Sequence, residues 1–311
     1  MAKEKRAYSG GHFELFLDGH KTTAYMKSID GGNKKLNIIE EGHGSDLNKL
    51  KHPSTVDIEP FTIECGMSGT NDILRLMEKS WKKGFRGFNG QVTHGDFDLR
   101  PVFEHEFFNA LLTEVTFPSL DGAAKDPAYL KFKFQPQEVV TRTVSGGGPR
   151  LQMPMSAKQK LWNPSNFRFT IDGIDETQKT NKLESFTIKQ GVKKHYNGPE
   201  QELKLQASNV VFPSLSGTIA LAFADGLFRW HNETHRKRMS SARSHRTGSI
   251  EFLNPDLTKT LFAIHLYEVG ITTVHVAPST ANQDQVKRAK FELSVGRMEL
   301  DPGLPFGFGF G

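Results

Sequence analysis

Apolar and polar residues alternate with a period of two along most of the chain. The clearest segments are Phe13–Leu17 and Phe167–Ile171, and each runs into an Asp-Gly pair that is typical of a hairpin turn. This pattern predicts a mainly β fold, because half-buried strands alternate in this way. The further predicted strands are Leu36–Glu40, Val56–Glu64, Phe107–Phe117, Tyr129–Phe134, Phe186–Lys189, Glu202–Ala207, Thr218–Phe223, Ser249–Leu253, Leu261–Val269 and Lys290–Gly296.

Two segments follow a helical period instead. In Asn71–Lys82 the apolar residues fall on one face, and Asn71 is a candidate N-cap. The second segment is Gly226–Met239, with Leu227 and Trp230 as its apolar anchors. A series of strands with one helix midway, occurring twice, predicts two small β-barrels or sandwiches, each flanked by a helix.

The chain also contains an internal repeat. Two pairs of segments match at one offset of 154 residues, and a third pair follows in the same order with a small shift. Three matches in one order indicate a tandem duplication. The matched pairs are Phe13–Gly19 with Phe167–Gly173, Phe107–Val115 with Leu261–Val269, and Leu130–Phe134 with Ala289–Leu293.

The repeat and the breaker residues together predict the domain boundaries. We expect one domain over 8–141, a linker over 142–164, a second domain over 165–300 and a Gly/Phe-rich tail over 301–311. Ser145–Pro149 is a flexible stretch, and Pro154 and Pro164 exclude a regular element across the linker. The tail alternates Phe and Gly, and is either an arm that docks its Phe side chains in a neighbour or a disordered end.

Composition narrows the class of protein. Hydrophobic residues make up 36% of the chain and charged residues 24%, which is typical of a globular protein and not of a disordered one. No apolar run is long enough for a membrane span, and the one cysteine, Cys65, excludes an internal disulfide. We expect that the charged segment Met1–Gly11, which contains no apolar stretch, is not a signal peptide. The 24 Phe against 5 Tyr favour extensive burial within sheets or between subunits.

The order of motifs in the first half resembles a known family. A strand that ends in Asp18-Gly19 is followed by Lys35–Gly42, Lys49–Pro53, Phe61–Cys65, a helix that runs to Trp81, the segment Glu114–Gly122 and the strand Leu130–Phe134. This order is similar to that of the tail tube proteins of contractile phage tails and contractile injection systems. The second half resembles the same family less closely.

The resemblance implies an assembly and a set of partners. It implies that each barrel is one of six around a lumen and that rings stack into a tube. Because this chain carries two units, we expect three chains to close one ring, with a ring of six chains as the alternative. The implied partners are other copies of the chain, a sheath, and baseplate hub or adjacent tube proteins. DNA or protein cargo would pass through the lumen, in a virion tail or injection particle assembled in the bacterial host cytoplasm. The resemblance implies no catalytic residue, cofactor, metal or membrane.

A basic stretch in the second half is the candidate contact with a partner. An acidic protein surface is favoured over DNA, because a conduit that bound DNA tightly would impede its passage. The alternative is a solvated helix face and loop. The stretch contains Arg229, Arg236, Lys237, Arg238, Arg243 and Arg246.

Two histidine motifs suggest rival functions. His231 and His235 lie one helical turn apart and could present both rings to zinc, as in a hydrolase, but Glu233 stands one place too late for the zinc-protease signature. His94-Gly95-Asp96 with His105 resembles an acid–base pair, although turn chemistry is the favoured interpretation. A third possibility is a monomeric β-barrel module that binds a small ligand. We expect Cys65 to be buried as a small hydrophobe.

Overall fold

The computed structural model describes residues 11–22, 24–42, 49–67, 70–82, 87–144, 149–152, 162–197, 202–237, 245–278 and 286–302. It is mainly β, as the alternation predicts, with two α-helices and two short 3-10 helices among these residues. No helix in the described ranges is long and apolar enough to cross a membrane.

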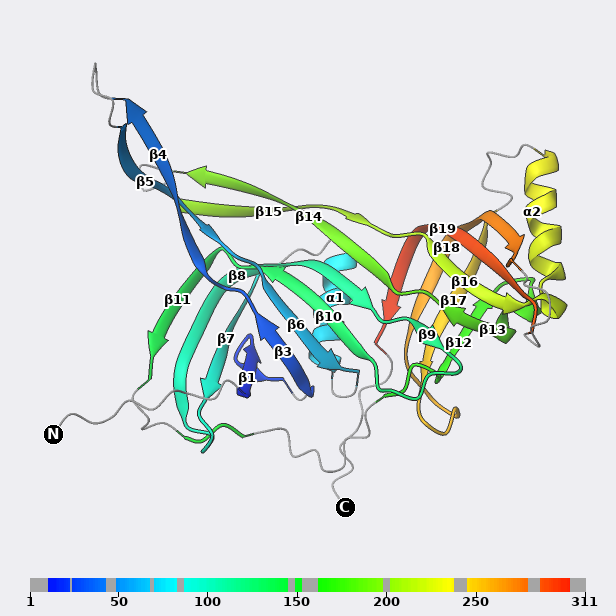
Figure 1. Cartoon of the computed structure of the whole chain (residues 1–311), viewed down its shortest axis with the longest axis horizontal. Coiled ribbons are helices and arrows are strands. Elements are labelled where there is room, and N and C mark those ends of the chain that lie inside the picture. The colour runs from blue at the N-terminus through cyan, green and yellow to red at the C-terminus, as the bar shows by residue number, and fades with distance from the viewer. Residues whose placement is uncertain are drawn as a thin grey trace.

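The first half contains most of one curled sheet, a hairpin and one helix (Figure 1). Its elements are β1 (His12–Leu17), β2 (His20–Lys21), β3 (Met26–Asp30), β4 (Lys34–Gly42), β5 (Lys49–Ile58), β6 (Phe61–Gly66), α1 (Asn71–Trp81), β7 (Phe88–Gly95), β8 (Pro101–Phe117), β9 (Leu120–Asp121), β10 (Tyr129–Gln135) and β11 (Glu138–Thr143).

The second half repeats this order of elements. They are β12 (Phe167–Ile171), η1 (Asp175–Lys179), β13 (Thr180–Leu183), β14 (Phe186–Asn197), β15 (Glu202–Val211), β16 (Leu215–Ala220), η2 (Leu221–Phe223), α2 (Asp225–Lys237), β17 (Arg246–Leu253), β18 (Thr260–Val276) and β19 (Arg288–Asp301). The long β19 takes the place of both β10 and β11.

The two sheets have the same strand order. The first runs β2-β1-β7-β8-β10-β6-β3 and the second runs β12-β17-β18-β19-β16-β13-β9. When β1 is matched to β12, β7 to β17, β8 to β18, β10 to β19, β6 to β16 and β3 to β13, the two paths coincide. The repeat found in the sequence is therefore also a repeat of topology.

Unusual backbone conformations recur at matching points. Leu99 and Leu257 both have positive φ (63° and 57°), each in the turn that leads into the longest strand of its half. Within those strands Asn109 and Glu268 also have positive φ (47° and 55°). A left-handed conformation is strained for such side chains, so its recurrence at equivalent places is a local signature of the duplication.

The ladders correct one of the three sequence matches. Phe132 pairs with Val115, and Phe291, the repeat partner of Phe132, pairs with Val274. Val115 therefore corresponds to Val274, and the gapless match of Val115 to Val269 is wrong. Most of the extra residues of the second half lie between α2 and β17, where the offset grows from 154 to 158, and one more lies between β17 and the ladder of β18.

Several predicted elements differ in extent or number. Val56–Glu64 is two strands, because the chain turns at Glu59 and Pro60 between β5 and β6. Thr218–Phe223 ends in a 3-10 helix, η2, and α2 begins at Asp225. Thr70, not Asn71, is the N-cap of α1, and no side-chain hydrogen bond caps that end. The predicted end of the second helix at Met239 lies outside the described residues.

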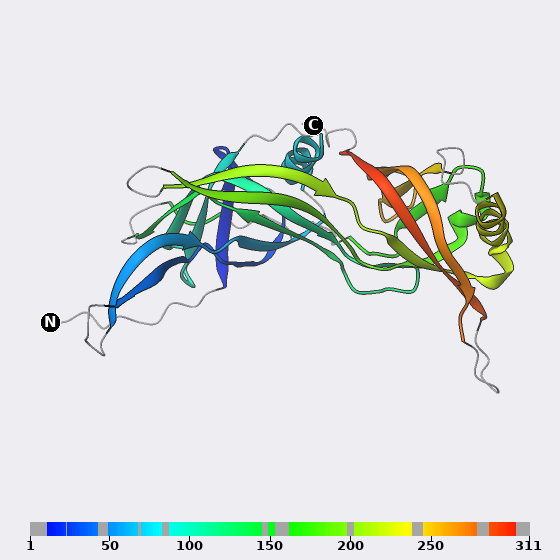
Figure 2. The same ribbon diagram turned by 90° about the horizontal axis from the view of Figure 1, so that it is seen from above.

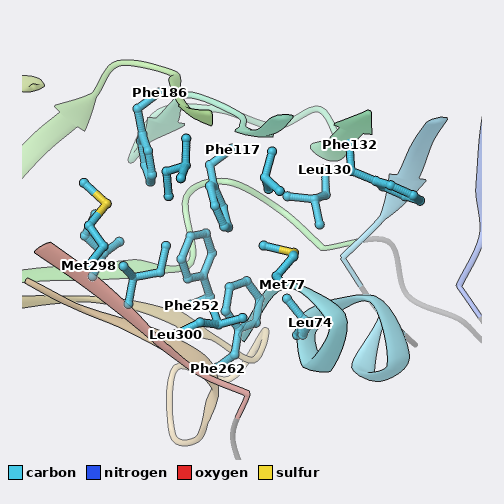
Figure 3. Close-up of a cluster of buried hydrophobic side chains, with 14 of the residues drawn as sticks. Leu74, Met77, Phe117, Leu130, Phe132, Phe186, Phe252, Phe262, Met298 and Leu300 are labelled. Atoms are coloured by element: carbon cyan, nitrogen blue, oxygen red, sulfur yellow. The ribbon is translucent and has the colours of Figure 1, made fainter. Parts of the chain in front are cut away.

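Buried side chains form one core that continues through both halves. At its centre the side chains of α1, β8, β14 and β17–β19 meet (Figure 3). Phe117, Phe186, Phe252 and Phe262 are the aromatic members of that region, and each is at most 4% exposed. These four Phe side chains fill the space where the two halves meet, while Phe61, Phe88, Phe107 and Phe134 form a separate aromatic cluster within the first half.

Candidate assembly interfaces

The two halves of the chain exchange strands where they meet. β14, which belongs to the second half, pairs with the end of β8 in the first half, and the Cα partners run from Phe186↔Phe117 to Lys189↔Glu114. The Oγ atoms of Thr116 and Thr187 lie 2.9 Å apart across this ladder. On one edge of β8, β7 pairs only with residues from Pro101 to Ala110. β14 pairs with the rest of that edge, so the first sheet extends into the second half of the chain.

In a second ladder, a strand of the first half joins the sheet of the second half. β9 of the first half pairs with β13 of the second, through Lys182↔Asp121 and Leu183↔Leu120. The amide of Gly122 donates to the carbonyl oxygen of Asn181 at 2.9 Å. Each half therefore closes an edge of the other half's sheet, which leaves fewer exposed strand edges at the junction.

Aromatic rings fill the junction. The ring centroid of Phe117 lies 5.0 Å from that of Phe186, 5.7 Å from that of Phe252 and 6.5 Å from that of Trp81. Trp81, at the end of α1, also meets Phe212 edge-on at 6.2 Å. These contacts tie α1 and β8 of the first half to β14, β17 and the residue after β15 in the second.

Helix α1 lies between the two sheets (Figures 1 and 2). Its apolar face buries Leu74 and Met77, and its C-terminal end faces β19 across a groove of about 630 Å³. Lys82 follows the helix: its hydrogen bond to Glu78 raises the pKa of the ammonium group, and Glu299 and Asp301 of β19 add to that effect. The charges at this contact are complementary.

The long hairpin β14–β15 reaches across the first half (Figure 1). Its ladder runs from Lys189↔Val211 to Asn197↔Glu202. Lys194 Nζ donates to Asp57 Oδ1 of β5 at 2.6 Å, and the Ser80 hydroxyl of α1 donates to Gln190 Oε1. The hairpin is thus anchored to the first half at its start and along its length.

Among the described residues, the equivalent hairpin of the first half, β4–β5, is not paired with another sheet in this way. β4 pairs only with β5 in the described part of the chain, and the two form a separate two-stranded sheet. All of β4 is exposed. Its apolar side chains include Leu36, Ile38 and Ile39, which are 57%, 64% and 51% exposed, and Leu50 of β5 is 49% exposed. An exposed apolar strand of this kind is typical of a surface that binds a partner.

The edge that would receive such a hairpin is also unfilled. The end of β18 corresponds to the end of β8. In the described ranges, residues 270–276 pair with β19 and with no other strand. Val276, the counterpart of the fully buried Phe117, is 46% exposed. The chain therefore has a free hairpin at one end and a free strand edge at the other.

The candidate basic residues lie around α2, at the end of the molecule farthest from β4–β5 (Figures 1 and 2). Arg229 and Arg236 are exposed on the helix. Arg246 begins β17, donates to the carbonyl oxygen of Asp172 at 2.6 Å and lies over the ring of Trp230 at 5.3 Å. Lys237 ends α2, and Arg238 and Arg243 lie outside the described residues.

The two histidine motifs have different surroundings. His231 and His235 are on α2, half-buried and exposed respectively. Within the described ranges no three His, Cys, Asp or Glu side chains are grouped so that they could hold a metal ion. Asp96 does form a turn, because its carboxylate accepts from the amide of Arg100 at 2.8 Å. His94, however, belongs to strand β7 and not to the turn.

His94 and His105 face each other in an aromatic cluster at one end of the first sheet. Their ring centroids are 5.9 Å apart, and Phe103 meets the ring of His105 edge-on at 4.7 Å. Burial lowers the pKa of both imidazoles, and the neighbouring His94 lowers that of His105 further. Cys65 is fully buried in β6, and this burial raises the pKa of its thiol.

The residues selected from the sequence are charged residues and histidines, and the structure adds strand edges and aromatic side chains as candidate contacts. Phe117, Trp81 and Phe186 form the junction, yet in the sequence they look like ordinary core residues. The signal available in the sequence was the apolar content of the first hairpin. Leu36–Ile39 is as apolar as a core strand, yet the strand that contains it pairs with β5 alone among the described residues and is exposed.

Comparisons with known proteins give matches among solved structures alone. No protein-family model and no curated protein matches the chain. The cap that terminates the tube of the anti-feeding prophage is 15% identical, with a TM-score of 0.40, over 46% of this chain and 96% of that one. A chain of the PVC sheath–tube complex, an extracellular contractile injection system, is 17% identical, with a TM-score of 0.39, over 45% and 95%. Hcp1 from Flavobacterium johnsoniae is 11% identical, with a TM-score of 0.26, over 44% and 95%.

Proposed function

We propose that this chain is a self-assembling structural subunit of the tail tube, or of the tube–baseplate junction, in a phage or contractile injection system, and that it is not an enzyme. The observation that carries the proposal is the junction between its two halves. That junction joins two similar units head to tail, and among the described residues the counterparts of its two surfaces, β4–β5 and the end of β18, pair with no other part of the chain's sheets.

A head-to-tail contact between like units can be repeated without limit. Where the rotation between successive units closes, the result is a ring, and where it does not close, the result is a filament. Here the free hairpin β4–β5 of one copy would occupy the free edge of β18 in the next, as β14 occupies the edge of β8 within the chain. Backbone hydrogen bonds between strands supply the affinity in such contacts.

The repeat fixes the register of this contact. Gly32–Lys35 corresponds to Phe186–Lys189, and Thr273–Val276 corresponds to Glu114–Phe117. Lys35 of one copy would therefore lie opposite Thr273 of the next, as Lys189 lies opposite Glu114. The exposed Leu36 and Ile38 would then be covered where the hairpin crosses the neighbouring copy.

We favour a ring of three chains, in which six units surround a lumen, over a ring of six chains. Stacked rings would form a conduit for DNA or protein cargo. Sheath, baseplate hub and adjacent tube proteins are the proposed partners, in a virion tail or injection particle assembled in the bacterial host cytoplasm. We propose that residues 8–141 and 165–300 are the two units that occupy successive positions in the ring.

Native mass spectrometry over a range of protein concentrations tests the proposal. We expect a trimer that grows into stacked multiples, and electron micrographs of rings with six-fold features. A ring of six chains would contradict the trimer alone. A chain that stays monomeric at high concentration would contradict the tube function and favour a monomeric binding module, and stoichiometric zinc in the purified protein would favour a hydrolase.

A further inference from the structure

Helices α1 and α2 occupy the same place in the two halves, and each packs one face on its own half. The buried side chains include Ile73 of α1, which is 1% exposed, and the equivalent Leu227 of α2, which is fully buried. Trp230 continues the face of α2 beneath Arg246 of β17. The two helices are therefore comparable residue by residue, with Ile73 matched to Leu227 and Lys82 to Arg236.

The second face of α1 covers a strand edge of the other half. Residues 297–301 of β19 pair with β18 on one side, and no described strand pairs with them on the other, because β16 ends its ladder at Leu293. Helix α1 packs along this part of β19. Leu74 and Met77 are buried there, at 2% and 0% exposure.

The second face of α2 has no such cover among the described residues. Phe228 and His231, which correspond to Leu74 and Met77, are half-buried. His235 and Arg236, which correspond to Trp81 and Lys82, are exposed. Figure 2 shows α2 at the far end of the molecule, away from the first half. This face is thus the open counterpart of a face that the junction buries.

In the first half, β11 corresponds to the part of β19 that α1 covers. It pairs with β8 on one side and with no described strand on the other. Val140, which corresponds to Glu299, is 39% exposed. Natural proteins seldom leave such an edge open, because an unpaired edge invites non-specific pairing.

We propose that the second face of α2 in one copy covers the β11 edge of another copy, as α1 covers the edge of β19 within the chain. The inference rests on the proposed head-to-tail assembly and names a further contact in it. It assigns the basic stretch around Arg236, and the pair His231 and His235, to a contact between copies.

The charges on the two surfaces fit this assignment. Arg229 and Arg236 are exposed on α2. At the β11 edge, Glu104 and Glu106 of β8 both lie within salt-bridge distance of Arg142, at 2.8 Å and 3.7 Å. Glu138 adds a further exposed carboxylate at the start of β11. Glu104, Glu106 and Glu138 outnumber Arg142 at this edge, so its charge is complementary to that of the exposed arginines of α2.

Cross-linking tests the contact directly. The variant Arg236→Cys/Val140→Cys, treated with a short bis-maleimide, should give covalently linked dimers and larger species in a denaturing gel. The matched control is Lys82→Cys/Glu299→Cys, which carries the equivalent pair at the junction. It should link within one chain, so that the protein stays at the position of a single chain in the gel. The parent chain measures any background from Cys65, which is fully buried.

A pair of substitutions at one exposed position gives a second readout. Val140→Glu gives the β11 edge a carboxylate at the position equivalent to Glu299 of β19. It should lower the concentration at which half of the protein assembles. Val140→Arg places a like charge opposite Arg236, and should raise that concentration about tenfold. Both variants should melt as the parent does, because the side chain is on the surface.

The outcomes separate this inference from the proposed function. If the parent assembles but the Arg236→Cys/Val140→Cys variant links only as the background does, the α2–β11 contact is wrong and the ring proposal stands. The contact is also wrong if Val140→Arg assembles as well as Val140→Glu. If the parent never assembles, both proposals fail.

Discussion

Among single residues, Phe117 links side chains of both halves at the junction. It is fully buried and its ring meets Trp81, Phe186 and Phe252. We expect Phe117→Ala to lower the free energy of unfolding by about 3–5 kcal/mol, because the cavity cannot collapse between two sheets. Denaturant unfolding measures this change.

The control for this prediction is Phe97→Ala. Phe97 is 83% exposed in the turn between β7 and β8, and its loss should change stability by less than about 0.5 kcal/mol. Equal effects of the two substitutions would show that the junction contributes no more than the surface does.

The aromatic cluster of His94 and His105 predicts a pH dependence. Their pKa values are lower in the folded chain than the ordinary 6.5, so the unfolded chain binds more protons as the pH falls. The stability from the neutral rings is complete above about pH 6.5 and is lost below it, toward the folded pKa. The melting temperature should therefore fall between pH 7 and pH 5.

A variant and a control separate this effect from general acid denaturation. His105→Asn keeps a polar partner for Thr141, whose hydroxyl lies 3.1 Å from Nδ1, and should flatten the pH profile. His20→Gln, at an exposed residue, should leave the profile unchanged. An unaltered slope in His105→Asn would mean that other groups cause the loss of stability.

Among the elements, the hairpin β4–β5 is predicted to serve assembly and not folding. In Leu36→Asp/Ile38→Asp both substituted side chains are more than half exposed, so the melting temperature should stay within a few degrees of the parent's. Assembly should be lost, because two carboxylates would have to be buried at the contact. Analytical ultracentrifugation with a thermal melt checks both outcomes, and unfolding of the variant would contradict the prediction.

The alternation of residues predicted the strands whose two faces differ in exposure, such as β1, β10 and β17. It missed β7 because Phe88–Gly95 carries Gly90 and polar residues where alternation expects apolar ones. A Cβ on Gly90 would lie 2.3 Å from the carbonyl oxygen of Phe16 and 2.4 Å from the ring of Phe107. Close approach of neighbouring strands, and not hydrophobicity, selects that residue.

The polar end of β14 was missed for a related reason. Val192–Asn197 has little apolar character, and it is a strand because β15 pairs with it and Asp57 holds Lys194. The choice of β8 as the partner of β14 was also beyond prediction. Period-two alternation says which face of a strand is buried, but not which edge it joins.

For the whole molecule, the head-to-tail proposal predicts complementation. Leu36→Asp/Ile38→Asp damages the hairpin end and keeps the edge of β18, whereas Val276→Asp damages the edge and keeps the hairpin. Each variant alone should be monomeric, but a mixture should give a dimer of one copy of each, since one intact contact remains. Native mass spectrometry distinguishes the two chains, and a mixture that stays monomeric would contradict a head-to-tail contact.

The candidate site was predictable only in part at this scale. The sequence indicated the duplication and the assembly class, because both depend on the order of elements. It selected the basic stretch as the contact, which stays a prediction, whereas the junction within the chain consists of strand edges and a face of α1. Whether a surface is free or covered depends on the neighbouring half, and no local pattern contains that information.

The strand exchange between β8 and β14 has a kinetic consequence. Because the two units share one chain, their contact forms at a high effective concentration and needs no diffusional encounter. A closed ring of three chains would need two encounters between molecules, whereas six separate units would need five. The critical nucleus for ring formation would then be smaller, and the lag before tubes appear would depend less steeply on the rate of synthesis of the chain.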